Sequence, residues 1–313
     1  MKNSENKLKE QLLEIASAYK QGKNVMEIAR KKYNEDNKNN SYSILLSYDL
    51  QAGTYNKQLK GSLSSFYDNW GKQLSEILNS YSHPNNSFLE IGCGECSTMV
   101  YVLKYLRNDY SKMYGFDISW SRIFEGNKII NEHQSKTNLF VADLFSIPLA
   151  DNSIDIIYSS HSLEPNAGKE ELAIRELLRV ARDKVILFEP IYELANKEQQ
   201  DRMDSHGYIK NLKDVSELFD VNILMYETVP IYSIELNRSG VIVLEKKNKK
   251  NIGSQNKALD QDIWQCPVTD QSIQRHQDLF FNEKVGLAYP ILRGIPLLQK
   301  DHHIIASKIT ELI

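Results

Sequence analysis

The sequence predicts an α/β fold built on a mostly parallel, seven-stranded sheet with helices on both faces, and three observations predict it. From Phe88 onward, short apolar runs alternate with helical segments, which is typical of strand–helix–strand units. The first run leads into a glycine turn at residues 90–94. Acidic residues then stand at the ends of successive expected strands, at Asp117, Asp143 and Asp155.

The individual strands follow from short apolar runs that are bounded by turn-forming residues. The last two should form a hairpin across residues 237–239, so that the final strand is antiparallel to a largely parallel sheet. The expected strands are 88–91, 112–116, 139–141, 154–159, 184–188, 231–236 and 240–244.

The region before the sheet, residues 1–84, should be helical. Leu8, Leu12, Ile15 and Tyr19 recur at helical spacing among Lys, Glu and Asn, which indicates one or two amphipathic helices up to about residue 36. A polar break at 35–40 precedes further helical segments.

An unusual stretch between those helices predicts either a lid over a binding site or plain helix packing. Gly53 marks a turn among aromatic and amide side chains, with Tyr48, Gln51 and Tyr55 close to it and Trp70 further on. As a lid, this stretch would cover a donor or bind an acceptor. The two interpretations stand equal at this point.

The remaining chain divides into three parts. Residues 85–246 carry the expected sheet. Residues 247–262 are polar and charged with almost no core-forming side chains, which is typical of a linker. Residues 263–313 should form a small α+β appendage, because they contain aromatic residues and several turn signals but are too few for an enzyme.

Composition favours an ordinary globular protein inside the cell. The 313 residues are 41% hydrophobic and 25% charged, and the formal net charge is −3. No polybasic surface is indicated, so we expect nucleic-acid binding to be disfavoured. The N-terminus is polar and resembles no signal peptide, and apolar runs such as 185–188 are too short to cross a bilayer. These features predict a cytoplasmic protein without a membrane span, and they leave its oligomeric state open.

Three cysteines argue against a disulfide framework and fit a reducing compartment. Cys93 and Cys96 have the C-x-x-C spacing of a redox motif or half a zinc site. Both lie inside the glycine turn, which explains them better, and no second pair exists. We therefore predict no metal site.

The glycine turn predicts a nucleoside-binding site. Gly92 and Gly94 let the backbone turn tightly after an apolar strand and approach a ligand without a Cβ in the way. Asp117 follows Gly94 by 23 residues (117 − 94 = 23), where an acid reaches ribose hydroxyls. Asp143 follows the third strand and suits an adenine amino group, with Leu144 as an apolar neighbour.

Together these residues resemble the class I methyltransferases that use S-adenosylmethionine (SAM), over about residues 85–245. The resemblance implies a Rossmann-like sheet with SAM as cofactor. It departs from the family pattern at Cys96, the third small position of the glycine motif. Asp155 resembles the structural acid that opens the family's fourth strand, not a catalyst. The cofactor-binding residues that we expect are Glu90, Gly92, Gly94, Asp117, Ile118, Asp143, Leu144 and Ser160.

Candidate catalytic residues follow the fourth and fifth strands, because ligands bind at the carboxyl ends of parallel strands. Methyl transfer to a hydroxyl requires alignment and removal of a proton, for which a histidine near neutral pKa is suited. His161 is the first candidate base and His206 the second, and Glu164 or Glu189 could orient the imidazole. For each histidine, capping or packing is the structural alternative. The expected acceptor-binding residues are Tyr48, Gln51, Tyr55, Tyr192 and Tyr208.

The appendage carries a second resemblance. Residues 264–269 and 286–298 resemble the zinc-ribbon-like activator proteins of tRNA and protein methyltransferases. Thr269, Asn282 and Val285 stand where metal-binding cysteines would be, and Cys266 alone cannot hold a tetrahedral zinc. We expect a metal-free fold held by apolar packing of Tyr289, Ile291, Ile295, Leu297 and Leu298.

Three functional hypotheses result. The first is SAM-dependent methylation of a small-molecule acceptor, for example a sugar or nucleotide-sugar hydroxyl. The second is methylation of tRNA or a translation factor, which the appendage suggests. Against it, the fourth strand ends in Ser-Ser-His-Ser and not in the Asn-Pro-Pro-Tyr type of motif used on planar amines. The third is a non-catalytic SAM-binding protein.

Overall fold

A twisted seven-stranded sheet lies at the centre of the computed structural model, which describes residues 2–33, 38–107, 109–248 and 263–309. The strand order is β3-β2-β1-β4-β5-β7-β6. The first five strands are parallel, and β7 is antiparallel to both of its neighbours. The predicted sheet is therefore confirmed. Its strands are β1 (Ser87–Ile91), β2 (Lys112–Asp117), β3 (Asn138–Val141), β4 (Ile154–Ser160), β5 (Ala181–Glu189), β6 (Val221–Thr228) and β7 (Gly240–Lys246).

One expected strand was wrong. The segment 231–236 is not a strand, and the predicted hairpin across 237–239 does not form. The sixth strand is β6, an edge strand whose exposed positions obscure its pattern. Pro230 separates the two segments, and Ile234 and Leu236 are exposed instead of paired. The connection 229–239 forms a loop that ends in the short 3-10 helix η2 (Glu235–Asn237).

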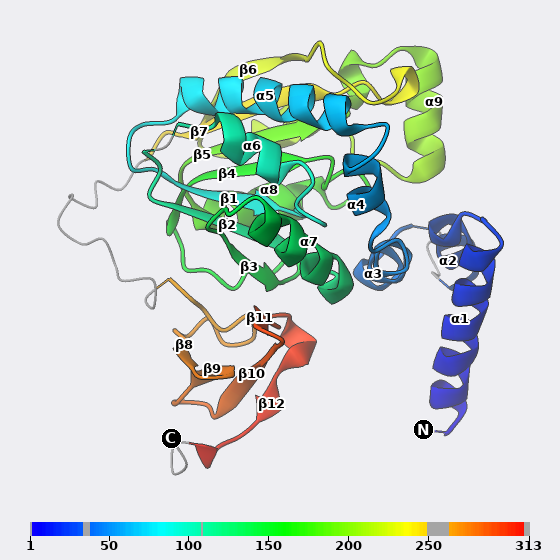
Figure 1. Cartoon of the computed structure of the whole chain (residues 1–313), viewed down its shortest axis with the longest axis vertical. Coiled ribbons are helices and arrows are strands. Elements are labelled where there is room, and N and C mark those ends of the chain that lie inside the picture. The colour runs from blue at the N-terminus through cyan, green and yellow to red at the C-terminus, as the bar shows by residue number, and fades with distance from the viewer. Residues whose placement is uncertain (1, 34–37, 108, 249–262, 310–313) are drawn as a thin grey trace.

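Both faces of the sheet are buried, because successive residues of a strand point to opposite faces. Ile186 and Phe188 of β5 pack with the helices on one face, whereas Val185 and Leu187 belong to the core on the other. Figure 1 shows α5, α6 and α7 over one face. The helices around the sheet are α5 (Ser64–Tyr81), α6 (Met99–Tyr105), α7 (Trp120–Glu132), α8 (Glu170–Val180), α9 (Lys197–His206), α10 (Leu212–Ser216) and the 3-10 helix η1 (Tyr192–Leu194).

The N-terminal region is helical as expected and lies along one side of the sheet domain (Figure 1). It contains α1 (Lys2–Lys20), α2 (Val25–Tyr33), α3 (Ser41–Asp49) and α4 (Thr54–Leu59), and it leads into α5. Buried Ile15, Ala18, Val25 and Ala29 hold α1 against α2 in a small core of their own. No described helix is long and apolar enough to cross a membrane.

The C-terminal unit docks on the β3 edge of the sheet. The amide of Leu298 donates to the carbonyl of Val141 at 2.9 Å, and the ring of Trp264 meets that of Phe140 at a centroid distance of 5.1 Å. Trp264 and Tyr289 belong to the same core as the sheet residues. The unit comprises β8 (Gln274–His276), β9 (Leu279–Asn282), β10 (Leu287–Leu292), β11 (Ile295–Pro296), η4 (Lys300–His302) and β12 (Ile304–Ile305).

Apolar packing of this unit is confirmed: Tyr289, Ile295 and Leu298 are fully buried, Ile291 is nearly so, and Leu297 packs against the sheet core. The thiol of Cys266 lies 3.2 Å from the hydroxyl of Tyr289. Within the described part of the chain, no three His, Cys, Asp or Glu side chains gather as a metal site would require. The predicted linker falls mostly on residues 249–262, which are outside the described residues, and the domain limits given above stay predictions.

Candidate functional site

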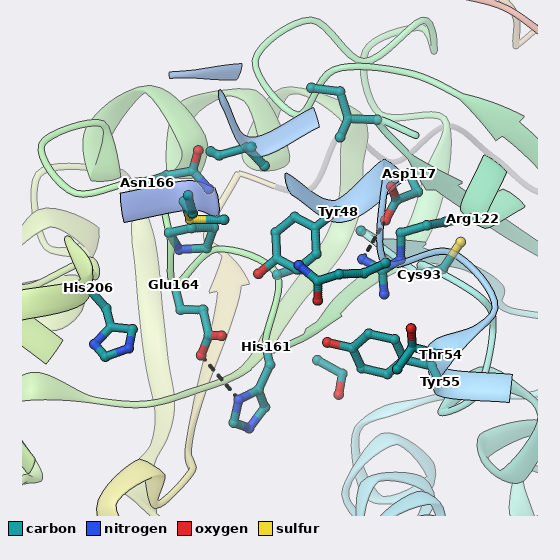
Figure 2. A pocket seen from close by; sticks show the side chains of 18 of the residues that line it. Tyr48, Thr54, Tyr55, Cys93, Asp117, Arg122, His161, Glu164, Asn166 and His206 are labelled. Atoms are coloured by element: carbon teal, nitrogen blue, oxygen red, sulfur yellow. Dashed lines mark hydrogen bonds and ion pairs between the residues drawn. The ribbon is translucent and has the colours of Figure 1, made fainter. Parts of the chain in front are cut away.

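A cavity of about 760 Å³ opens at the carboxyl ends of β1 to β4. That volume is in the range of small-molecule and cofactor sites. The N-terminal helices α2 to α5 and the segments 202–208 and 233–237 complete its walls. Figure 2 shows Asp117, Arg122 and Cys93 at one end, His206 at the other, and His161 with Glu164 between them.

The glycine turn lies at one end of this cavity and requires both of its glycines. Gly92 and Gly94 have φ values of +58° and +53°, the left-handed region that disfavours other residues. A Cβ on Gly92 would lie 2.4 Å from Cβ of Ser162, and one on Gly94 would lie 2.3 Å from Nη2 of Arg122. Gly92 lines the cavity, and Gly94 does not.

Asp117 connects the end of β2 to the glycine turn. Its Oδ2 accepts the Gly94 amide at 3.0 Å, and its Oδ1 accepts the Ser119 amide at 2.9 Å. Nη1 of Arg122 lies 3.7 Å from the carboxylate. A carboxylate offers about four acceptor positions, so each oxygen retains capacity for a further hydroxyl donor from the cavity, which Asp117 lines.

Glu90 is buried at the end of β1 and accepts a hydrogen bond from the Tyr158 hydroxyl at 2.7 Å. Burial raises its pKa to about 8, although the bond from Tyr158 lowers it. Burial therefore favours the neutral form of the Glu90 carboxyl.

The ends of β2 and β3 combine apolar surface with a second carboxylate. Asp143 accepts the amide of Phe145 at 2.9 Å through Oδ1, and Ile118 and Leu144 line the cavity beside it. Asp155, in contrast, accepts the amide and hydroxyl of Ser87, each at 2.8 Å, away from the cavity.

His161 follows β4 and joins two side chains. Its Nδ1 lies 3.2 Å from Oε2 of Glu164, and its Nε2 lies 2.6 Å from Oγ of Ser239. Burial lowers the pKa of His161, but the hydrogen bond and charge of Glu164 and the charge of Glu189 outweigh it, so that the net pKa is raised above 6.5. His161 and Glu164 line the cavity; Ser239 is fully buried and does not.

Glu189 does not occupy the place that we expected. It is fully buried, and its carboxylate accepts the backbone amides of Ser162, Leu163 and Glu164 at 3.0 to 3.3 Å. Burial raises its pKa to about 7, against a lowering effect of His161. Glu189 thus holds the loop after β4 in shape, and of the two glutamates it is Glu164 that contacts the imidazole.

Of the expected acceptor-binding residues, Tyr48, Gln51, Tyr55 and Tyr208 line the cavity. Tyr192 does not, because its hydroxyl instead donates to Asp204 at 3.2 Å on the surface. Ser160 and His206, which were predicted as cofactor-binding and catalytic residues, also line the cavity and form hydrogen bonds with close neighbours. Ser160 accepts from Nε1 of Trp70 at 3.0 Å, and Nδ1 of His206 lies 2.8 Å from the carbonyl of Arg202.

Glu95 is a site residue that the sequence reasoning missed. It directly follows Gly94, is fully buried, and accepts two amides of the N-terminal region, that of Gly53 at 2.9 Å and that of Asn56 at 2.8 Å. These amides belong to the start of α4, whose N-cap is a glycine and supplies no capping side chain. The glycine turn therefore holds the cover of the cavity directly.

Arg122 is a second missed residue. Its guanidinium lies between the rings of Tyr48 and Tyr55, 4.9 and 4.8 Å from their centroids, a cation–π arrangement. Its buried Nε has no hydrogen-bond partner among the described residues. The position of Arg122 in the sequence, shortly after Asp117, did not predict this role. Its two ring partners come from a distant part of the sequence.

The C-x-x-C pair shows no redox arrangement. Cys93 and Cys96 are buried and free, with their sulfurs 4.0 Å apart. Burial raises the pKa of Cys93 well above the ordinary thiol value, which disfavours the reactive thiolate.

Comparison with known proteins gives the domain a class. Residues 89–188 match the model of a methyltransferase-domain family. The structure of magnesium protoporphyrin IX methyltransferase (ChlM) from Synechocystis PCC 6803 with bound S-adenosylhomocysteine (SAH) is 13% identical, with a TM-score of 0.51 over 66% of this chain and 99% of that chain. The structure of the same protein with bound SAM is also 13% identical, with a TM-score of 0.51 over 66% of this chain and 96% of that chain.

A putative sarcosine dimethylglycine methyltransferase from Galdieria sulphuraria is 13% identical, with a TM-score of 0.45 over 58% of this chain and 86% of that one. No curated protein sequence matches. At 13% identity, the likeness to the ChlM structures shows the fold, and the family match shows the domain. The chain therefore carries a methyltransferase domain, and its sheet has the fold of the ChlM structures. The hypothesis of a non-catalytic protein is set aside.

Proposed function

Because the chain carries a methyltransferase domain, we propose that it transfers the methyl group of SAM to a hydroxyl of a small molecule enclosed in the same cavity. The observation that carries the proposal is the continuity of this cavity, which extends from Asp117 at the glycine turn past His161 to His206. Sugar and nucleotide-sugar hydroxyls belong to this class of acceptor.

The residues at the turn end of the cavity support SAM as the methyl donor. The carboxylate of Asp117 would accept the ribose hydroxyls, and Asp143 would accept the adenine amino group. Ile118 and Leu144 supply the apolar surface for the adenine ring. Gly92 leaves the backbone open to the methionine part.

The N-terminal cover supports a small acceptor over tRNA or a translation factor. Helices α2 to α5 contribute to the wall opposite the strand ends, and Glu95 holds α4 in place. Among the described residues, none after Asn237 lines the cavity. We accordingly propose that the C-terminal unit is a metal-free relative of the zinc-ribbon-like activators that supports the β3 edge, and not a docking platform for RNA.

We propose His161 as the general base, oriented by Glu164. When bound, SAM supplies an electrophilic methyl carbon on its sulfonium, so the protein has to align the acceptor and receive a proton. As a carboxylate Glu164 can only accept, which places hydrogen on Nδ1 and leaves Nε2 as the basic nitrogen. In this structure Nε2 is engaged by Ser239, so an acceptor hydroxyl has to replace Ser239 as its partner.

A label-transfer experiment tests the acceptor class. An extract of the source organism is separated by ultrafiltration into small molecules and macromolecules, and each fraction is incubated with the protein and methyl-labelled SAM. We expect label in the small-molecule fraction, at a level that depends on the added protein. A protein whose Gly92 is replaced by valine serves as the blank. Label that enters only RNA or protein would contradict the proposal.

A further inference from the structure

We infer that the acceptor carries an anionic group, a phosphate or a carboxylate, that binds between Arg30 and Arg202 at the end of the cavity remote from the glycine turn. The inference rests on the proposed function, because it concerns the part of the cavity assigned to the acceptor. Both arginines line the cavity. They come from distant parts of the sequence, α2 and α9.

Arg30 is a buried cation without an acidic partner. Arg30 is only 8% exposed. Its Nη2 donates to the backbone carbonyl of Ser205 at 2.7 Å. Among the described residues, no carboxylate lies within ion-pairing distance of it. The bond to the last turn of α9 occupies one nitrogen of the guanidinium. The remaining donors are left for a ligand, because a guanidinium has five N–H groups.

Arg202 faces the same space from α9. Its Nη1 donates to Oδ1 of Asn237 at 2.6 Å, and its guanidinium lies over the ring of Tyr208 at 5.5 Å. Within the described part of the chain it also forms no ion pair with a carboxylate. Two neutral partners thus position the guanidinium and leave its charge uncompensated.

Two acids of the cavity wall have partners other than the arginines. Glu27 pairs with Lys31 at 2.5 Å on the surface, and Glu164 contacts His161, whose pKa it raises. Lys23 also lines the cavity and adds positive charge. A buried charge without a counter-charge is costly, and a guanidinium binds phosphate and carboxylate through paired hydrogen bonds. An anionic ligand group would supply the missing counter-charge and would accept the free N–H groups of the guanidinium.

The test uses SAH-loaded protein and two simple anions. Calorimetric titrations at constant ionic strength measure the binding of pyrophosphate and of malonate, with neutral malonamide as the matched probe. We expect at least one anion to bind and malonamide not to bind. Arg202→Gln should weaken anion binding roughly 10- to 150-fold, the equivalent of one lost charge-assisted hydrogen bond. Arg30→Gln should do the same, provided that its melting temperature shows an intact fold.

The control variant is Arg275→Gln, which removes an exposed arginine on β8 outside the cavity and should bind both SAH and the anion like the wild type. Binding of malonate alone identifies a carboxylate site, and binding of pyrophosphate alone a phosphate site. The inference is overturned if neither anion binds at millimolar concentration, if malonamide binds equally well, or if Arg202→Gln has no effect. Wild-type protein that fails to bind SAH would instead refute the proposed function.

Discussion

Replacing Glu95 by alanine is expected to release α4 from the glycine turn. The substitution removes the acceptor of two buried amides, those of Gly53 and Asn56. A hydrogen bond to a charged group contributes about 1.5–3 kcal/mol. Hydrogen exchange at these two amides should therefore accelerate by roughly 10- to 150-fold. SAH should bind more weakly, because Tyr55 leaves the cavity wall with α4.

Glu132→Gln provides the matched control for this experiment. Glu132 forms an exposed ion pair with Lys60, just after α4, at 2.8 Å, and exposed pairs contribute little. Its loss should leave amide exchange in α4 and SAH affinity nearly unchanged. Unaltered exchange at Gly53 and Asn56 in the Glu95→Ala protein would show that α4 is held by other contacts.

The second large effect is expected at His161. If it is the general base, His161→Ala should lower turnover of the acceptor by ~10²–10⁴-fold and leave SAH affinity intact. Ser239→Ala separates this role from a structural one. It frees Nε2 from its protein partner, so a catalytic His161 predicts no loss of turnover. A comparable loss in both variants would indicate that the hydrogen-bonded chain only supports the loop.

The pH profile provides an independent measure of the same role. A base must be unprotonated, so turnover should rise with pH through the raised pKa of His161. Glu164→Gln removes the strongest raising influence while burial, which lowers the pKa, persists. The acid limb of the profile and the titration of the imidazole followed by NMR should then both move to lower pH. A shift to higher pH in either would argue against this account.

Local signals predicted which residues line the turn end of the cavity. The turn after β1 could be predicted because glycines follow an apolar run in the sequence. The role of the acids after β2 and β3 could be predicted because parallel strands end at one edge of the sheet. The cavity accordingly contains Gly92, Asp117 and Asp143. These residues are close in space because each stands at or just after the end of one of three neighbouring parallel strands.

The rest depends on contacts between distant segments. Glu95 was unremarkable beside the glycines, because its partners Gly53 and Asn56 lie about 40 residues earlier. Arg30 and Arg202 are 172 positions apart (202 − 30 = 172), and only the folded chain brings them to one cavity. The strand β6 was misplaced because an edge strand is half exposed, which weakens its apolar pattern.

Calorimetric titration with SAH tests the central claim most directly, namely that the cofactor binds at the glycine turn with Asp117 on its ribose. Asp117→Asn should weaken binding by roughly 10- to 150-fold, since the amide loses charge-assisted hydrogen bonds. Asp155→Asn is the matched control: it alters a carboxylate that accepts a backbone amide of Ser87 outside the cavity and should keep wild-type affinity. Equal affinities of Asp117→Asn and wild type, or no binding of SAH to either, would contradict the account.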